Sequence, residues 1–387
     1  MQDLTKPGGN GSEEKAERKL TGAMQYGSPL VPFFDDIEQD DLEHVGGKGL
    51  SLGTVTRHGL PVPAGFCVTT ESYKRFTDVV PDFVECRDAL ENVAAEDTDS
   101  IRQGAAEMRD RINATTFPSA VVAAVTSMFG NVSAEDDVKG RAFAVRSSAT
   151  LEDLPEASFA EQHDSYLEVR GVEEILQKLR ECFASLFTDR GVAYRRRQEL
   201  REVDAQMAVV VQAMAASEVA GVLFTADPIS GSRDVCIIDA SYGLGEAVVS
   251  GVVNPDGYRV NKSDGVLVSH HVGDKLVAIV PENSGGVQTV EVAQADRERR
   301  ALDDKELAQI VELGRNVEEL SGQPQDVEWG IENGGVMLLQ SRPITSLYPL
   351  PQSMREFDPS SEPSYDDMLV FLSALGISRR IQRCGAR

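Results

Sequence analysis

The sequence predicts an α/β (α+β) fold that divides into two lobes. Residues 82–130 have the character of helices, with acidic loops near them. The second half is richer in β-branched apolar runs bounded by Gly, Pro and Asp, which are typical of strands. With 387 residues and 41% hydrophobic residues, the chain can bury a large core, as one domain of two lobes or as two domains.

Changes in composition divide the chain into three parts. Residues 1–26 are rich in Gly, Lys, Glu and Ser and lack an apolar period, which predicts a disordered leader. Residues 27–345 carry the core, with a first lobe at about 27–200 and a second lobe at about 201–345. Residues 346–387 are rich in Pro, Ser, Asp and Glu and then turn basic, so we expect a linker-like tail without a core.

A glycine-rich stretch, residues 45–49, leads into the apolar residues of a short predicted helix. Glycines let backbone N–H groups approach a phosphate, and a helix N-terminus adds partial positive charge. Lys48 would supply a mobile positive charge beside them. The stretch therefore predicts a phosphate-binding turn, and a surface turn with an exposed lysine is the alternative.

The apolar run 142–145 predicts a buried strand with Arg146 at its C-terminal end. The following residues, 147–162, have the composition of a loop and begin with small hydroxyl side chains. An arginine in this position suits bidentate binding of a phosphate. An ion pair with one of the many carboxylates is the alternative. A single helical stretch is predicted later, over Val172–Arg197.

The second lobe is predicted to hold a sheet and a long amphipathic helix. Asp303 can cap this helix, apolar residues recur on one of its faces, and Gly322 ends it. The predicted strands are Met207–Gln212, Gly221–Thr225, Val235–Ala240, Tyr258–Asn261, Gly265–Ser269 and Leu276–Val280.

A β-hairpin is predicted at the end of the second lobe, with strands Asp326–Ile331 and Val336–Ser341. A three-residue loop, 333–335, would place Glu328 directly opposite Gln340, whereas a two-residue loop would shift this pairing by one residue.

Strand alternation predicts that Gln340 and Arg342 share a face with Val336 and Leu338. Glu328 and Gln340 then offer two oxygen ligands beside the guanidinium of Arg342. This set suits Mg²⁺ held between protein and phosphate oxygens, with Arg342 stabilising the transferred phosphoryl group. The polar outer face of an edge hairpin is the alternative.

Two weaker candidates complete the set. Gly243-Leu244-Gly245-Glu246 follows a predicted strand and is a candidate nucleotide loop, although such turns are common. Gln212 ends an apolar strand and can hydrogen-bond an adenine edge, or it can be a buried residue satisfied by the backbone.

The charge and the cysteines exclude several classes of function. The formal net charge is −25, which disfavours binding to nucleic acid or to anionic membranes. The five cysteines form no C-x-x-C pair, so neither a disulfide framework nor a zinc site is indicated. No apolar run approaches the roughly 18 residues that span a bilayer. We therefore expect a cytoplasmic protein.

In order along the chain, seven stretches together resemble the N-terminal ATP-grasp region of the phosphoenolpyruvate synthase (pyruvate, water dikinase) family. Pyruvate phosphate dikinases and rifampicin phosphotransferases share this region. Each motif is modest, but their collinear order makes a chance match improbable. The stretches are Val45–Gly53, Gly59–Thr69, Ala144–Phe159, Val210–Met214, Ala220–Ser232, Ser241–Pro255 and Gln325–Thr345.

The resemblance implies a two-lobed ATP-grasp cleft that binds ATP with Mg²⁺. It implies that Lys48, Arg146 and Arg342 bind phosphates and serve in transfer, and that Gln212 contacts the adenine side. Glu328 and Gln340 match its Mg²⁺ ligands. Ser165 and Tyr166 match a loop that covers the nucleotide.

One residue departs from the family pattern inside that covering loop. Where the family has glycine within Ser-Phe-Ala-Gly-Gln, this chain has Glu161. A glutamate adds a negative charge and a Cβ where the backbone lies against phosphate. Glu161 therefore either weakens ATP binding or turns its carboxylate outward.

In these enzymes the phosphoryl group passes to a histidine on a separate domain and then to a final acceptor. No phosphohistidine motif or acceptor domain follows in this sequence. Four hypotheses remain: an ATP-binding half-enzyme whose phosphohistidine and phosphoenolpyruvate/pyruvate domains lie on another chain, a fragment of a synthase, a rifampicin-phosphotransferase-like domain, or a non-catalytic module that senses ATP or AMP.

Overall fold

The computed structural model describes residues 29–135, 138–150, 153–154, 157–158, 165–282 and 285–347. Among these residues, those up to 227 and those from 232 to 344 form one compact unit. The sheets, the helices and the site described below belong to this unit. The predicted leader, all but the first two residues of the predicted tail, and Glu161 lie outside the described residues.

A four-stranded antiparallel sheet forms the first lobe. Its strand β6 is a continuous apolar run in which every residue is buried, as is typical of a strand covered on both faces. β6 thus extends the first sheet beyond residue 200, where the sequence placed the division between lobes. The strand order is β1 (Gly65–Val68), β6 (Met207–Ala213), β2 (Phe143–Ala149) and β5 (Ser165–Val169).

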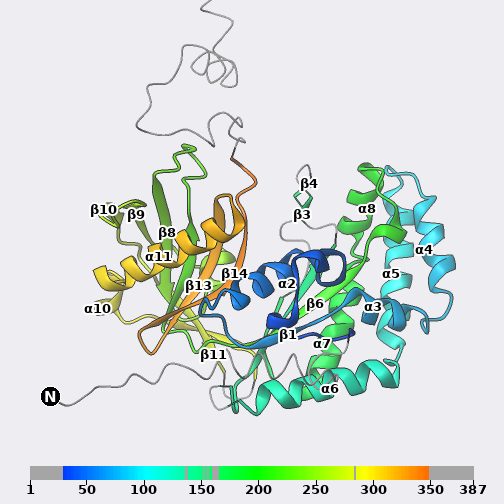
Figure 1. The fold of residues 1–387 in the computed structure, drawn as a ribbon. Helices are drawn as coiled ribbons and strands as arrows, with labels where there is room; N and C mark the ends of the chain where they lie inside the picture. Colours follow the sequence, from blue (N-terminus) through cyan, green and yellow to red (C-terminus); the bar gives the residue numbers. More distant parts are fainter. Residues whose placement is uncertain are drawn as a thin grey trace, which may run out of the picture. The chain divides into compact units, whose positions relative to one another are not determined.

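Helices surround this sheet (Figure 1). Their apolar faces form a core rich in phenylalanine, where the Phe183 ring lies 5.6 Å from Phe76 and 5.9 Å from Phe117 between centroids. The single helix predicted over Val172–Arg197 is two helices, because Thr188 caps a new one. The helices are α3 (Thr70–Thr77), α4 (Phe83–Glu91), α5 (Thr98–Ala114), α6 (Ser119–Ser133), α7 (Gly171–Ser185) and α8 (Asp189–Arg197).

A six-stranded antiparallel sheet forms the second lobe, and helix α11 (Asp304–Ser321) packs against it. The prediction for this helix is confirmed: the Asp303 side chain accepts from the backbone N–H of Glu306, and Gly322 ends the helix with a φ of 68°. The strand order is β10 (Leu267–His271), β9 (Asp256–Asn261), β8 (Val235–Tyr242), β7 (Val219–Phe224), β13 (Gln325–Glu332) and β14 (Gly335–Pro343).

Helix α2 (Leu42–Arg57) connects the two sheets by packing against β2 and β6 of the first and β14 of the second (Figure 1). Its buried residues Leu52 and Val55 share one core with Val210 of β6 and Trp329 of β13. The two sheets are therefore joined by a common apolar core.

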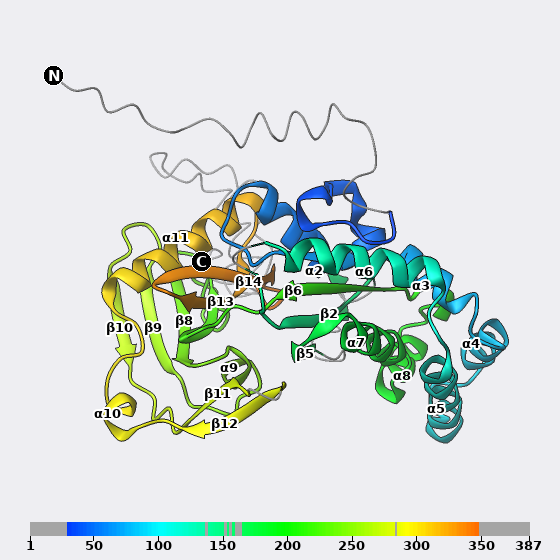
Figure 2. The same ribbon diagram turned by 90° about the horizontal axis from the view of Figure 1, so that it is seen from below.

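Smaller elements complete the unit (Figure 2). In the described part of the chain no single helix is long and apolar enough to cross a membrane, and the bent pair α5–α6 passes that test by length and composition only. The smaller elements are the hairpins β3 (Asp153–Leu154)–β4 (Ala157–Ser158) and β11 (Val277–Pro281)–β12 (Val287–Glu291), helices α9 (Glu246–Val249) and α10 (Gln294–Arg297), and the 3-10 helices η1 (Phe34–Asp36), η2 (Gln39–Asp41) and η3 (Glu202–Asp204).

Lys275 and Asp256 form a fully buried ion pair next to β11. The ammonium group also donates to the carbonyls of Gly273 and Arg297, and the carboxylate accepts from the backbone N–H of Ala301. Buried charges are tolerated when they are paired and hydrogen-bonded. The pair therefore ties two loops to the start of β9.

We expect Lys275→Met to destabilise the fold by about 3–5 kcal/mol, because it leaves the Asp256 carboxylate buried without its partner. Lys262→Met is the matched control, since Lys262 pairs with Glu318 while 16% and 25% of the two side chains stay exposed. For the control we expect a loss of about 1 kcal/mol or less. Urea denaturation measures both, and equal losses would contradict the role of the buried pair.

Candidate functional site

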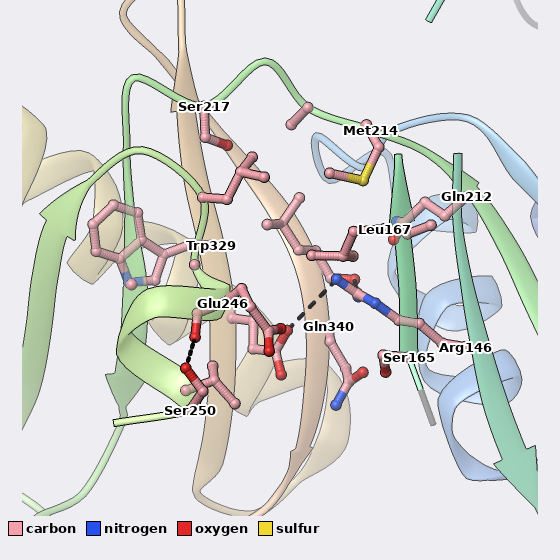
Figure 3. Close-up of a pocket in the computed structure, with 18 of the residues that line it drawn as sticks. Arg146, Ser165, Leu167, Gln212, Met214, Ser217, Glu246, Ser250, Trp329 and Gln340 are labelled. Atoms are coloured by element: carbon pink, nitrogen blue, oxygen red, sulfur yellow. Dashed lines mark hydrogen bonds and ion pairs between the residues drawn. The ribbon is translucent and has the colours of Figure 1, made fainter. Parts of the chain in front are cut away.

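A cavity of about 570 Å³ is lined by residues of both sheets, of α9 and of the linker 214–218 that joins β6 to β7. Its volume falls in the usual range for small-molecule sites, about 300–1,000 Å³. Figure 3 shows Arg146 and Ser165 on one side of it and Glu246 on the other. The predicted site residues that line the cavity are Lys48, Arg146, Ser165, Gln212, Glu328, Gln340 and Arg342.

The predicted glycine turn is present, but it interrupts α2 instead of opening it. Gly46 has a φ of 67° and a ψ of 176° between helical residues. A Cβ at this position would collide with the carbonyl and the hydroxyl of Ser148. The Ser148 hydroxyl donates to the Val45 carbonyl at 2.8 Å, which holds the turn against β2. Lys48 follows the turn and lines the cavity.

Arg146 lies in the middle of β2, so the prediction that it ends the strand was wrong. Residues 147–149 pair with residues 207–209 of β6, and this pairing outweighs their loop-like composition. Arg146 Nη1 donates to the Leu339 carbonyl at 3.1 Å, and Nη2 lies 3.7 Å from a carboxylate oxygen of Glu328. Arg146 thus lines the cavity and also forms an ion pair, which the sequence treated as alternatives.

Of the two loop lengths that the sequence left open, the hairpin of β13 and β14 has the two-residue loop, Asn333–Gly334. Both residues have positive φ, 52° and 74°, as tight hairpin turns require. Glu328 nevertheless lies directly opposite Gln340, the pairing expected only for a three-residue loop, because a β-bulge shifts the register by one residue. The additional residue is Leu339.

The bulge also changes which residues of β14 share a face. Val336 and Leu338 belong to the buried core, whereas Gln340 and Arg342 line the cavity. The prediction that all four lie on one face was wrong, because it assumed unbroken alternation along β14.

Asp326 holds Arg342, although no role was predicted for Asp326 from the sequence. The two residues are direct partners across β13 and β14, and the Asp326 carboxylate accepts from Arg342 Nε at 2.8 Å. Burial raises the pKa of the Asp326 carboxyl, Arg342 opposes this rise, and Glu328 adds to it. The signal was present in the sequence, since Asp326 precedes Glu328 by two residues and shares its strand face.

Gln212 is almost completely buried, with 1% of the residue exposed. Its side-chain nitrogen has no hydrogen-bond partner in the described part of the chain. Leaving a buried donor unpaired costs about 1–3 kcal/mol. Because Gln212 also lines the cavity, this nitrogen is an unpaired donor at the cavity wall.

Ser165 and Tyr166 lie in β5, and only the first lines the cavity. The Tyr166 ring instead lies 4.6 Å from the Lys178 ammonium. Glu161 lies outside the described residues.

The weaker loop candidate also reaches the cavity. Leu244, Gly245 and Glu246 line it, and Gly243 has a φ of 80°. A Cβ on Gly243 would collide with the Ile279 carbonyl, so glycine is required by space as well as by φ.

The pair of Glu328 and Gln340 fits a Mg²⁺ ion shared with phosphate. It offers a carboxylate and an amide oxygen side by side, and Mg²⁺ usually takes one or two protein ligands and completes its shell with water and phosphate oxygens. Among the described residues no group of three or more His, Cys, Asp or Glu side chains could hold a metal by itself.

Residues 42–357 match the family of pyruvate phosphate dikinase AMP/ATP-binding domains. The chain belongs to this family, so the resemblance and the fold class predicted from the sequence are confirmed.

Curated relatives carry two kinds of name. The chain is 42% identical over 324 residues to a rifampicin phosphotransferase from Streptomyces sp, which covers 84% of this chain and 37% of the relative. It is 42% identical over 323 residues to a probable phosphoenolpyruvate synthase from Methanothermobacter thermautotrophicus, covering 82% of this chain and 46% of the relative. The chain therefore spans less than half the length of these relatives.

We expect Gly46→Ala to destabilise the fold by about 2 kcal/mol or more, because the new methyl group meets the backbone of Ser148 and the residue keeps a positive φ. Gly59→Ala is the matched control, since Gly59 has a φ of 77° with nothing near its Cβ position. Thermal denaturation compares the two, and an equal loss would show that the contact with Ser148 is unimportant.

Proposed function

We propose that the cavity binds Mg-ATP and that the chain is the nucleotide-binding part of a phosphotransferase, which passes a phosphoryl group to a histidine on a separate domain or chain. The observation that carries the proposal is the convergence of Arg146, Glu328, Gln340 and Arg342 on one cavity from two sheets. Membership of the AMP/ATP-binding family supports the class of ligand.

The phosphates would bind at the basic side of the cavity, formed by Lys48, Arg146 and Arg342. A net charge of −25 repels a polyphosphate, so binding requires cations gathered locally. Mg²⁺ at Glu328 and Gln340 would offset the charge of the phosphate oxygens. Asp326 fixes the guanidinium of Arg342, so less conformational freedom is lost when that group meets a phosphate.

The nucleobase would bind near Gln212 and the linker 214–218. Gln212 offers an unpaired amide nitrogen, and Met214 and Ala215 add apolar surface to the cavity wall. Lys48 and Arg342 lie on other elements, so one cavity provides both an apolar side and a charged side for a nucleotide.

The final phosphate acceptor is left open by the relatives, because rifampicin phosphotransferases and probable phosphoenolpyruvate synthases match this chain equally well. A histidine acceptor on another domain suits both. Separating AMP plus phosphate from ADP among the products tests the dikinase type of chemistry.

A non-catalytic module that senses ATP or AMP is the second candidate, and Glu161 favours it. A carboxylate and a Cβ at a position where the family has glycine oppose the approach of a phosphate. Tight AMP binding with no transfer from ATP would support this candidate over the first.

We expect Arg342→Ala to slow phosphoryl transfer by about 100-fold, or roughly 3 kcal/mol, while ATP affinity changes much less, because the guanidinium would act most strongly on charge that develops during transfer. Glu328→Ala should instead weaken ATP affinity in the presence of Mg²⁺ and change it little in its absence. Calorimetry with and without Mg²⁺ measures binding, and labelling of a histidine-bearing domain from a relative measures transfer. Equal transfer by the wild type and Arg342→Ala would contradict the assigned role.

A further inference from the structure

The linker 214–218 is fixed at both ends by hydrogen bonds. At its start, the Met214 N–H donates to the Ala142 carbonyl at 2.9 Å, and the Met214 carbonyl accepts from Arg141 Nη1 at 3.2 Å. At its end, the Glu218 N–H donates to the Ile331 carbonyl at 2.9 Å. The linker, which forms part of the cavity wall, is therefore held in place at both ends.

One arginine side chain links the start of the linker to the second sheet. Arg141 Nη1 also donates to Glu332 Oε2 at 2.7 Å, across 191 positions of sequence. Arg141 lies just before β2, and Glu332 is the last residue of β13. The two side chains are 30% and 14% exposed, so the charge-assisted bond is partly shielded from water.

The middle of the linker has backbone polar groups without a hydrogen-bond partner among the described residues. Ala215 is 4% exposed and lines the cavity, yet its backbone N–H and carbonyl make no hydrogen bond with any other described residue. Buried backbone groups are almost always paired. Together with the amide nitrogen of Gln212, they form a short row of unpaired donors and acceptors at one side of the cavity.

We infer that Arg141 and Glu332 are positioning residues that hold this linker so that the Ala215 backbone faces a nucleobase. The inference rests on the proposed binding of Mg-ATP in the cavity. A fixed linker lowers the conformational entropy lost when a base binds. The planar guanidinium suits the role, because one group reaches a carbonyl and a carboxylate together, whereas a lysine ammonium lacks this fixed geometry.

The test separates the base side of the cavity from its phosphate side. Arg141→Met should weaken ATP binding by about 10-fold in Mg²⁺, a typical effect of losing one charge-assisted contact. The same variant should leave the affinity for tripolyphosphate unchanged, because that probe has no base and meets only the basic side. Arg141→Lys should fall between the wild type and Arg141→Met. Lys262→Met, which removes a partly exposed ion pair away from the cavity, should change neither affinity.

Calorimetry provides the affinities, and the single tryptophan of the chain provides a second signal because Trp329 lines the cavity. Thermal denaturation of each variant confirms that it is folded. Unchanged ATP binding in Arg141→Met would overturn the inference, and so would an equal loss for ATP and tripolyphosphate, which indicates a general structural role. A wild-type protein that binds neither ligand would overturn the proposed function itself.

Discussion

The contact between the Arg146 guanidinium and the Leu339 carbonyl joins the two sheets at the wall of the cavity. It exists because β14 carries one residue more than its partner strand needs. The bulge exposes the Leu339 carbonyl to a donor from the first sheet and restores the pairing of Glu328 with Gln340 that the two-residue loop would otherwise shift. Bulges often re-aim side chains next to functional sites. Here one bulge affects the positions of Arg146, Glu328 and Gln340.

Sequence patterns predicted the elements whose signals are local. The capping residue Asp303, the final Gly322 and the period of the helix between them were sufficient to place α11. Features that depend on distant pairing were not predictable in this way. Arg146 was expected at the end of a strand, because nothing in residues 147–149 shows that β6 pairs with them. The bulge at Leu339 was equally hidden, since an unbroken strand and a bulged strand share the same apolar pattern there.

The family resemblance placed residues that local patterns left undecided, and most of them line one cavity. Tyr166 is the exception among the described residues, because the strand turns its ring toward Lys178. Asp326 shows the opposite case: a carboxylate on the same strand face as Glu328 received no role from the sequence, although the structure pairs it with Arg342. A residue such as Asp326, which only positions another side chain, belongs to no sequence motif. It is found from its contacts in the structure.

A strongly acidic chain can offer a site to an anion when the fold brings distant basic residues together. Lys48, Arg146 and Arg342 come from a helix and from strands of two sheets, so no cluster of basic residues is visible in the sequence. Arg146 lies beside the Glu328 carboxylate, and Arg342 lies beside the Asp326 carboxylate. Each carboxylate holds its guanidinium in place but offsets part of its attraction for an anion. A divalent cation beside Glu328 would offset that carboxylate and restore the attraction for phosphate. We therefore expect affinity for a polyphosphate in such a site to depend on the metal more strongly than the count of basic residues suggests.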